Sequence, residues 1–283
     1  MAVLWGASWP AGKLLAQAAP PLQAAAWRFS VAVVALLIWL AFVNKGLPKL
    51  SLKQSLGMML GGAVGVFGYA YFFMVGLQSV PAGRASLVVT LNPVITTLMA
   101  ALLFGERFNW KIALGMALAF AGGITVLTHG EPWKLFAGEL GRGELLLLGC
   151  VLTWSSYTLL GKKLLQGVPA LTATAYTSAA GLALLWASAL AFEPLQSPWV
   201  LTSELYGAIA FLGLGATVLA YVWYFNGVAR LGAGTAASYI SLVPVFGVLS
   251  SVLYLSESVD ASLLIGGALA VMGVVLMNQA RKT

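Results

Sequence analysis

Apolar residues along this chain collect into long runs, which Gly, Pro and clusters of charge separate. A helix needs roughly 20 mostly apolar residues to cross the hydrocarbon core of a bilayer, and the runs have about this length. The pattern therefore predicts an all-α polytopic membrane protein whose connections are too short to form a sizeable soluble domain. Ten transmembrane helices are expected, at residues 2–18, 24–43, 55–77, 84–104, 110–128, 143–161, 170–192, 205–229, 234–255 and 261–279.

The composition excludes a water-soluble globular protein. Of the 283 residues, 60% are apolar and 8% are charged, and the mean hydropathy is +0.93, whereas about a quarter of the residues of a soluble chain are charged. The single cysteine, Cys150, excludes an intramolecular disulfide, and the single histidine, His129, excludes a multi-histidine metal site. We expect no metal, no cofactor and, despite the net charge of +7, no nucleic-acid partner.

The basic residues lie between the apolar runs and indicate how the chain is oriented. Cytoplasmic connections carry an excess of Lys and Arg. With the N-terminus in the cytoplasm, ten of the 15 basic residues fall on the inner side, which predicts a multi-pass protein of the plasma membrane (the bacterial inner membrane) with both termini cytoplasmic. The inner residues are Lys45, Lys49, Lys53, Arg107, Lys111, Lys162, Lys163, Arg230, Arg281 and Lys282.

The second half of the chain repeats the first. A shift of 151 positions aligns the halves without a gap from Gly76 to Val126. Five spans is an odd number, so the second copy enters the membrane from the opposite side, which predicts inverted-topology repeats of the kind found in secondary transporters. We assign 1–128 to the first repeat, 129–142 to an extracytoplasmic linker and 143–283 to the second repeat. The matched pairs include Gly76 with Gly227, Gly83 with Gly234, Pro93 with Pro244, Glu106 with Glu257, Gly115 with Gly266 and Gly122 with Gly273.

Three kinds of segment carry a family resemblance: the opening LWGASWPAGK, the AAWRF at the start of the second span, and a proline-containing span followed by Glu and a Gly-rich span in each half. They resemble the drug/metabolite transporter superfamily, specifically its duplicated EamA-domain members, over essentially the whole chain. The resemblance implies ten helices around a central cavity and export or exchange of small metabolites, such as amino acids, by alternating access. A lipid-linked carrier or flippase would share this fold.

Two departures from exact duplication stand out. Ser256 replaces Gly105 before the matched Glu, and Arg28 has no basic counterpart near Tyr176 or Thr177. No H-E-x-x-H, G-x-S-x-G or nucleotide-binding glycine motif occurs, so we expect a transporter, not an intramembrane enzyme.

Pro93 and Pro244 fall inside predicted spans at matched positions. Proline removes a backbone donor and clashes with the preceding turn, which frees the carbonyls near Val89 and Ile240. We interpret both prolines as hinges that line the substrate path, and a static packing kink is the alternative.

Hydroxyl, amide and aromatic side chains within the spans are the candidates for a substrate site. Ser86, Thr90 and Thr97 recur on one helical face with Pro93, where they line a cavity or join helices. Aromatic rings would favour apolar or aromatic solutes and amines, although core packing or an interfacial belt also explains single rings. The candidate substrate-binding residues are Trp5, Tyr69, Phe73, Ser86, Thr90, Asn92, Trp154, Tyr157, Tyr224, Asn226, Ser238 and Ser241.

Charged residues in or beside the spans form a second group of candidates. For Glu257 and its matched Glu106 we favour helix capping over a proton relay, because both lie at the junction of two spans. Arg84 begins a span, where the helix macrodipole disfavours a cation, so it needs an anion from a substrate or must extend to lipid headgroups. The possible charged contacts are Lys13, Arg28, Arg84, Glu106, Lys162 and Glu257.

Glycines spaced four apart predict close packing in the third span, at Gly57, Gly61 and Gly65. We expect these contacts to lie within the chain, because ten spans have many internal interfaces. A monomer is therefore expected, with a dimer left open, and the partners are a small-molecule substrate and the lipid bilayer.

Overall fold

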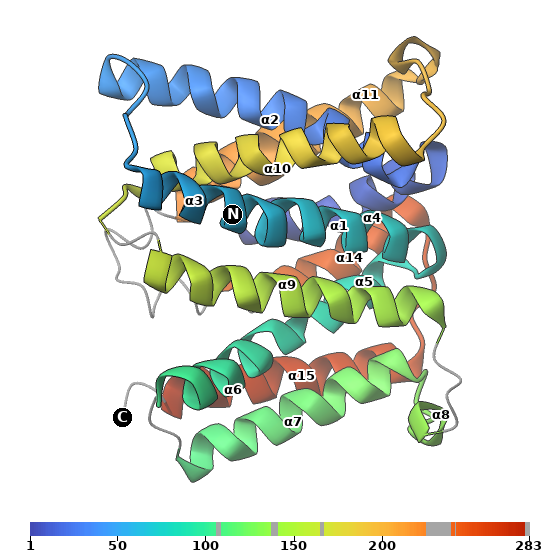
Figure 1. Ribbon diagram of the computed structural model, residues 1–283. Helices are drawn as coiled ribbons and strands as arrows, with labels where there is room; N and C mark the ends of the chain where they lie inside the picture. Colours follow the sequence, from blue (N-terminus) through green and yellow to red (C-terminus); the bar gives the residue numbers. More distant parts are fainter. Residues whose placement is uncertain (106–108, 137–140, 165–166, 225–238, 241, 281–283) are drawn as a thin grey trace.

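The computed structural model describes residues 1–105, 109–136, 141–164, 167–224, 239–240 and 242–280, and these ranges are helical and contain no strand. Consecutive long helices run back and forth between the same two ends of one bundle (Figure 1). In chain order the helices are α1 (Ala2–Ala18), α2 (Pro21–Asn44), α3 (Leu52–Gly61), α4 (Tyr69–Ser79), α5 (Ala82–Val88), α6 (Asn92–Phe104), α7 (Trp110–Leu127), α8 (Trp133–Phe136), α9 (Arg142–Leu164), α10 (Ala170–Phe192), α11 (Ser203–Ala210), α14 (Val243–Leu255) and α15 (Ala261–Ala280).

Eight helical segments of the described ranges are long and apolar enough to cross a membrane. They confirm a polytopic helical membrane protein; α14, with 13 residues, is a shorter apolar helix beside them, and α1 has 17 residues. The described ends of the predicted spans lie within three residues of their predicted positions, and the short helix α8 was not predicted. The predicted boundaries at 229 and 234 lie outside the described residues.

Local sequence signals fix where several helices begin. Pro21 and Pro81 stand at the starts of α2 and α5, where a missing N–H costs nothing. Ser51 and Gln54 form a reciprocal capping box at α3. The side chain of Asn109 accepts from the backbone N–H of Ile112 and so caps α7.

The helix that carries Pro93 is broken one turn before the proline. A 3-10 turn, Val89–Leu91, separates α5 from α6, and Pro93 lies in the first turn of α6. Pro244 occupies the same place in α14. The prediction of an opening near Val89 is confirmed, but the single continuous helix assumed for Ser86, Thr90 and Thr97 is wrong. The change in helical pitch at the 3-10 turn rotates the two halves of that stripe apart.

Two long helices contain π-helical segments at equivalent positions of the repeat. Gly62–Gly68 continues α3 into α4, and Phe211–Leu219 follows α11. The glycines around the first of them pack inside the chain: a Cβ on Gly61 would lie 3.1 Å from the Thr177 methyl group, and one on Gly62 would lie 2.6 Å from the Thr177 carbonyl. The predicted close contacts at this helix are therefore intramolecular.

A glycine seam joins α7 to α15, which lie side by side at the bottom of Figure 1. A Cβ on Gly122 would lie 2.5 Å from the carbonyl of Gly266, and one on Gly115 would lie 2.7 Å from the carbonyl of Gly273. The residue later in α7, Gly122, contacts the residue earlier in α15, Gly266, so the two helices are antiparallel. Because glycines occupy these contact points, the backbones approach as closely as they do in small-residue interfaces of membrane proteins.

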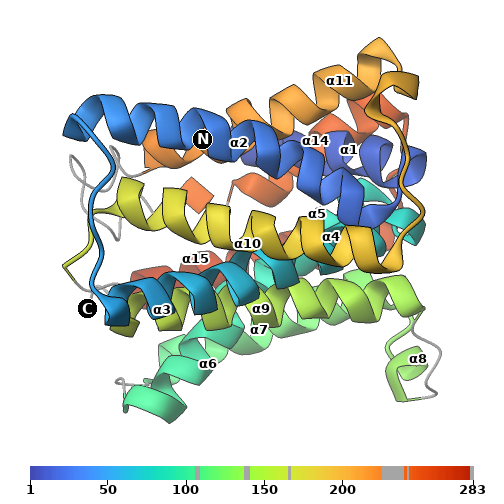
Figure 2. The same cartoon turned by 45° about the horizontal axis from the view of Figure 1, so that its top comes forward.

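The two ends of the bundle differ in charge. Glu193, Glu257 and Asp260 lie at the end where α2, α5 and α15 begin, which we call the acidic end. Lys45 and Lys49 lie in the segment 45–51 at the opposite end, which we call the basic end; it is on the left of Figure 1. In the turned view of Figure 2, α2, α10 and α3 form the near face, with α10 packed against both others.

Candidate functional site

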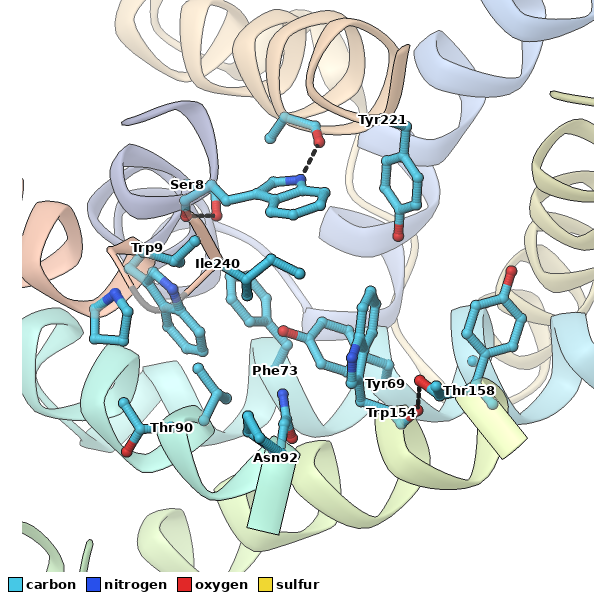
Figure 3. A pocket seen from close by; sticks show the side chains of 18 of the residues that line it. Ser8, Trp9, Tyr69, Phe73, Thr90, Asn92, Trp154, Thr158, Tyr221 and Ile240 are labelled. Carbon is cyan, nitrogen blue, oxygen red and sulfur yellow. Dashed lines mark hydrogen bonds between the residues drawn. The ribbon is translucent and has the colours of Figure 1, made fainter. Parts of the chain in front are cut away.

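A cavity of about 330 Å³ lies among helices from both halves of the chain. Figure 3 shows the rings of Trp9, Tyr69, Trp154 and Tyr221 around this space. The lining residues are Trp5, Ser8, Trp9, Arg28, Phe29, Gly65, Tyr69, Phe73, Val89, Thr90, Asn92, Pro93, Thr96, Trp154, Tyr157, Thr158, Thr174, Ser178, Ala216, Thr217, Tyr221, Ile240, Val243, Pro244, Val271, Val274 and Asn278.

Aromatic rings in mutual contact form much of the cavity wall. The ring centroids are 4.9 Å apart for Trp9 and Phe73, and 5.6 Å apart for Tyr69 and Trp154. The Trp5 indole donates a hydrogen bond to the carbonyl of Ala216 at 2.9 Å. Ala216 belongs to the π-helical segment Phe211–Leu219. These contacts hold the rings in place before any solute arrives, so the wall presents preorganised stacking surfaces.

The two proline-bearing helix starts contribute to the same cavity. Val89, Asn92 and Pro93 reach it from the α5–α6 break, and Val243 and Pro244 reach it from the start of α14. Interruptions of a membrane helix are tolerated where they line a cavity or are buried in protein. The cavity therefore lies where the break between α5 and α6 meets the start of α14.

Several polar side chains in the wall already make hydrogen bonds within the protein. The hydroxyls of Thr90 and Thr158 donate to carbonyls of their own helices, and Thr96 donates to Ser155. The Asn92 side-chain oxygen is buried without a hydrogen-bond partner. Most of the wall is apolar, and its unused hydrogen-bonding capacity is concentrated on a small number of side chains.

Arg28 brings a charge to the cavity. Its side chain is 7% exposed, and its guanidinium carbon lies 4.5 Å from the centre of the Phe29 ring and 5.2 Å from that of Phe73. The Nε atom has no hydrogen-bond partner. Every other residue that lines the described cavity is uncharged.

Arg84 is paired away from the cavity, at the acidic end. Its guanidinium lies 2.6 Å from Asp260 Oδ2 and also donates to the Val126 carbonyl. Arg84 is 5% exposed, so an extension to lipid headgroups is excluded, and its anion is Asp260 and not a solute. The Ser262 hydroxyl donates to Asp260 and holds the pKa of this carboxyl below its ordinary value.

Two carboxylates of the second half cap helices of the first half. Glu257 accepts the backbone N–H groups of Ala82 and Gly83, at 2.7 and 2.9 Å, and so caps α5. Glu193 accepts those of Leu22 and Gln23 and caps α2 in the same way. The capping interpretation of Glu257 is confirmed. Charge-assisted bonds to a positive helix end are among the stronger hydrogen bonds, and here they join the halves at the acidic end.

The comparison with known proteins identifies the family. The model of the EamA-like transporter family matches residues 1–128 and 141–279, which is most of the chain. This protein is an EamA-like transporter. It is therefore a multi-pass membrane protein with a transport function, and the resemblance in its motifs to the duplicated EamA members is confirmed.

Relatives of this EamA-like transporter carry the same kind of description. The Bacillus subtilis protein named "Uncharacterized transporter YyaM" is 29% identical over 257 residues, or 90% of this chain and 83% of the relative. The aromatic amino acid exporter YddG of Ancylobacter novellus is 28% identical over 262 residues, or 89% of this chain and 87% of the relative. One crystal structure has a TM-score of 0.70 at 26% identity and covers 100% of this chain and 96% of its own.

The structure brings together most of the candidate substrate-binding residues of this EamA-like transporter. Ser86 does not line the cavity: it is buried, and its hydroxyl donates to the Gly83 carbonyl. Tyr224 also lies outside the lining set and contacts the Trp5 ring at 5.7 Å. The candidates that do line the cavity are Trp5, Tyr69, Phe73, Thr90, Asn92, Trp154 and Tyr157, together with the prolines Pro93 and Pro244.

Other candidates are distributed differently. Lys13 faces protein, because its ammonium group donates to the Val80 carbonyl at 3.0 Å, and it lies outside the cavity. Asn226, Ser238, Ser241 and Glu106 lie outside the described residues, as does the side chain of Lys162.

Sequence reasoning missed several lining residues. Phe29 follows Arg28 directly, and Tyr221 belongs to an aromatic cluster that the repeat matches to the third span, so both carried a signal. Ser8, Thr174, Ser178, Thr217 and Asn278 are small polar residues in apolar helices, and nothing in the spacing separates them from hydroxyls that only bond their own backbone.

Proposed function

We propose that this EamA-like transporter exports a small apolar or aromatic metabolite, an amino acid or a related compound, across the plasma membrane by alternating access. The observation that carries the proposal is the aromatic cavity between the two halves. A volume of about 330 Å³ is at the small end of ligand sites, and contacting rings suit a planar or apolar solute. The name of the relative YddG, an aromatic amino acid exporter, supports this choice of substrate.

We further propose ten transmembrane helices in two inverted repeats, 1–128 and 143–283, joined by an extracytoplasmic linker. The glycine seam supports this arrangement. Gly115 contacts Gly273 and Gly122 contacts Gly266. The repeat matches Gly115 with Gly266 and Gly122 with Gly273, so replacing each residue of one contact by its match gives the other contact. Such reciprocal contacts are what a twofold axis produces, and antiparallel equivalent helices place that axis in the membrane plane.

The position of the cavity supports alternating access. Thr158 and Thr174 line it from either side of the connection between α9 and α10, and Asn278 lines it near the end of α15. All three lie toward the basic end, whereas Arg84, Asp260 and Glu257 tie helices together at the acidic end. With the basic end and both termini cytoplasmic, this conformation is closed to the outside, and exchange of shape between the halves would open the acidic end.

Counterflow in proteoliposomes tests the proposal. We expect labelled aromatic amino acids, or related apolar solutes, to exchange across vesicles that contain the protein. Trp154→Ala should lower the exchange rate about tenfold or more, because a stacking surface of the cavity is lost. Trp199→Ala is the matched control, since Trp199 is 87% exposed and lies outside the cavity. Absence of exchange for every water-soluble solute, with movement of a labelled lipid-linked sugar, would favour a flippase instead.

The hinge interpretation of the prolines makes a separate prediction. Pro93→Ala and Pro244→Ala restore a backbone donor in the first turn of α6 and of α14, and they remove a ring that opposes a continuous helix. We expect each variant to insert normally and to exchange solute about tenfold more slowly, which corresponds to about 1.4 kcal/mol in the barrier. The measurement is the counterflow rate per inserted protein. Wild-type rates in both variants would leave the prolines as packing kinks.

A further inference from the structure

Arg28 is a buried cation with no anion beside it. The described residues contain two ion pairs, Arg84–Asp260 and Lys134–Glu131, and Arg28 belongs to neither. Its side chain lines the cavity, and its Nε atom is unpartnered. The nearby rings of Phe29 and Phe73 stabilise a guanidinium by cation–π attraction, but they accept no strong hydrogen bond.

The charge of Arg28 cannot be removed by losing a proton, because a guanidinium stays protonated in proteins. A buried charge without a counter-charge is costly, and no carboxylate belongs to the described cavity lining. The protein therefore carries an unfavourable charge at its central cavity when the cavity holds no anion. An arginine kept at such cost is suited to recognition, since its planar donors match a carboxylate with two parallel hydrogen bonds.

Of the two halves of the chain, only the first contributes a cation to the described cavity wall. The part of α10 that corresponds to the Arg28 region contributes the hydroxyls of Thr174 and Ser178 to the cavity and no charge. One fixed positive charge is balanced by one negative charge on the solute. The ammonium group of a zwitterion would find aromatic rings and the unpartnered Asn92 side-chain oxygen in the described wall, but no carboxylate to balance its charge.

We propose that Arg28 binds the carboxylate of the transported solute, and that the cavity selects organic monocarboxylates with an apolar or aromatic body and a net charge of −1. This inference rests on the proposed transport function and adds the charge of the substrate to it. It also supplies a driving force. A membrane potential that is negative inside drives a monovalent anion outward, so export of such a solute needs no proton carrier among the residues of the cavity.

Three solutes that share a benzyl group test the charge preference directly. Phenyllactate carries −1, phenylalanine is a zwitterion, and phenylalaninol carries +1, and each differs from the next at one group. We expect the purified protein to bind phenyllactate most tightly, phenylalanine about 10-fold more weakly, and phenylalaninol about 100-fold more weakly or not at all, because the last lacks the group that pairs with Arg28. Equal affinity for phenyllactate and phenylalaninol would overturn the inference.

Substitution of Arg28 separates recognition from a structural role. Arg28→Gln should weaken phenyllactate binding about 10- to 100-fold and raise the thermal midpoint of the empty protein, because an unpaired buried charge has been removed. Arg28→Lys should recover part of the affinity. Arg84→Gln is the matched control, since it removes a buried arginine that is paired outside the cavity, and it should lower the midpoint and keep the preference for phenyllactate. A lowered midpoint with unchanged phenyllactate affinity in Arg28→Gln would overturn the inference.

Flux measurements keep this inference and the proposed function distinguishable. In proteoliposomes with an imposed potassium diffusion potential, phenyllactate efflux should accelerate when the interior is negative, and Arg28→Gln should lower this efflux about 10- to 100-fold at subsaturating phenyllactate. Potential-independent exchange of phenylalanine that survives in Arg28→Gln would refute the inference and leave the transport function in place. Absence of flux for every solute would refute the proposed function, and the binding series would then decide the role of Arg28 alone.

Discussion

Gly122→Leu yields no monodisperse protein in detergent, and Gly122→Ala lowers the free energy of unfolding by about 3 kcal/mol. These are the expected results because a Cβ on Gly122 would meet the Gly266 carbonyl at 2.5 Å and the Ala270 Cα at 2.9 Å. Both contacts are backbone atoms, so α7 and α15 would have to move apart. Overpacking costs about 1–3 kcal/mol at ordinary sites and more where nothing can yield.

Gly207→Ala is the matched control for the glycine seam. Gly207 lies within α11, and a Cβ there would meet nothing within 4 Å, so the helix gains up to about 1 kcal/mol from the better helix former. The comparison uses the thermal midpoint and the elution profile of the three variants. If Gly122→Ala unfolds at the same temperature as Gly207→Ala, the contact between α7 and α15 does not require a residue without a side chain at position 122.

Asp260→Asn should open the acidic end of the bundle. The substitution leaves the Arg84 guanidinium 5% exposed and without its ion pair. Breaking a fully buried pair costs about 3–5 kcal/mol, but Asp260 is 49% exposed, so solvent screening reduces the expected loss to about 1–3 kcal/mol. We expect a lower thermal midpoint, together with faster thiol labelling of a cysteine introduced at Ser86, which lies buried below Gly83 in α5.

The control for this prediction is Glu131→Gln. It breaks the exposed pair between Glu131 and Lys134, which is worth at most about 1 kcal/mol. Equal labelling rates in the two variants would show that Arg84 and Asp260 do not hold the acidic end closed.

Acidification also tests the ion pair between Arg84 and Asp260, because it protonates the Asp260 carboxylate. The pKa of Asp260 is lower in the folded protein than its ordinary value of about 3.9. The contribution of this carboxylate to the free energy of unfolding is therefore complete above about pH 3.9, and it is lost as the pH falls through the lowered pKa.

The acidic-end contacts show where sequence reasoning reached its limit. The position of Arg84 at the start of a helix indicated that it needs an anion, and the structure supplies Asp260, which is 176 residues away in the chain. A positive helix end and a buried guanidinium both require negative charge, but several carboxylates of the same side could have met that requirement. Only packing of α15 beside α5 and α7 selected one.

The cavity shows the same division. Matched aromatic and proline residues and an amide at membrane depth identified Trp5, Trp154, Pro93 and Asn92 as candidates, and the structure places all four in one lining. Ser86 has the same chemistry as Thr90 and the expected spacing, yet it is turned away. The reason is the 3-10 turn at Val89–Leu91, because a local change of pitch leaves no trace in a hydroxyl pattern.

The amino-acid sequence by itself determined that this is a polytopic helical protein, where the described spans begin and end, and that its halves are related. These features depend on burial of apolar runs in lipid and on local backbone chemistry, both of which act over about 20 neighbouring residues. Only the tertiary structure decided which polar groups meet. Arg28 came to face a cavity without an anion while Arg84 found Asp260, because partners of buried charges are chosen by helix packing across the whole bundle.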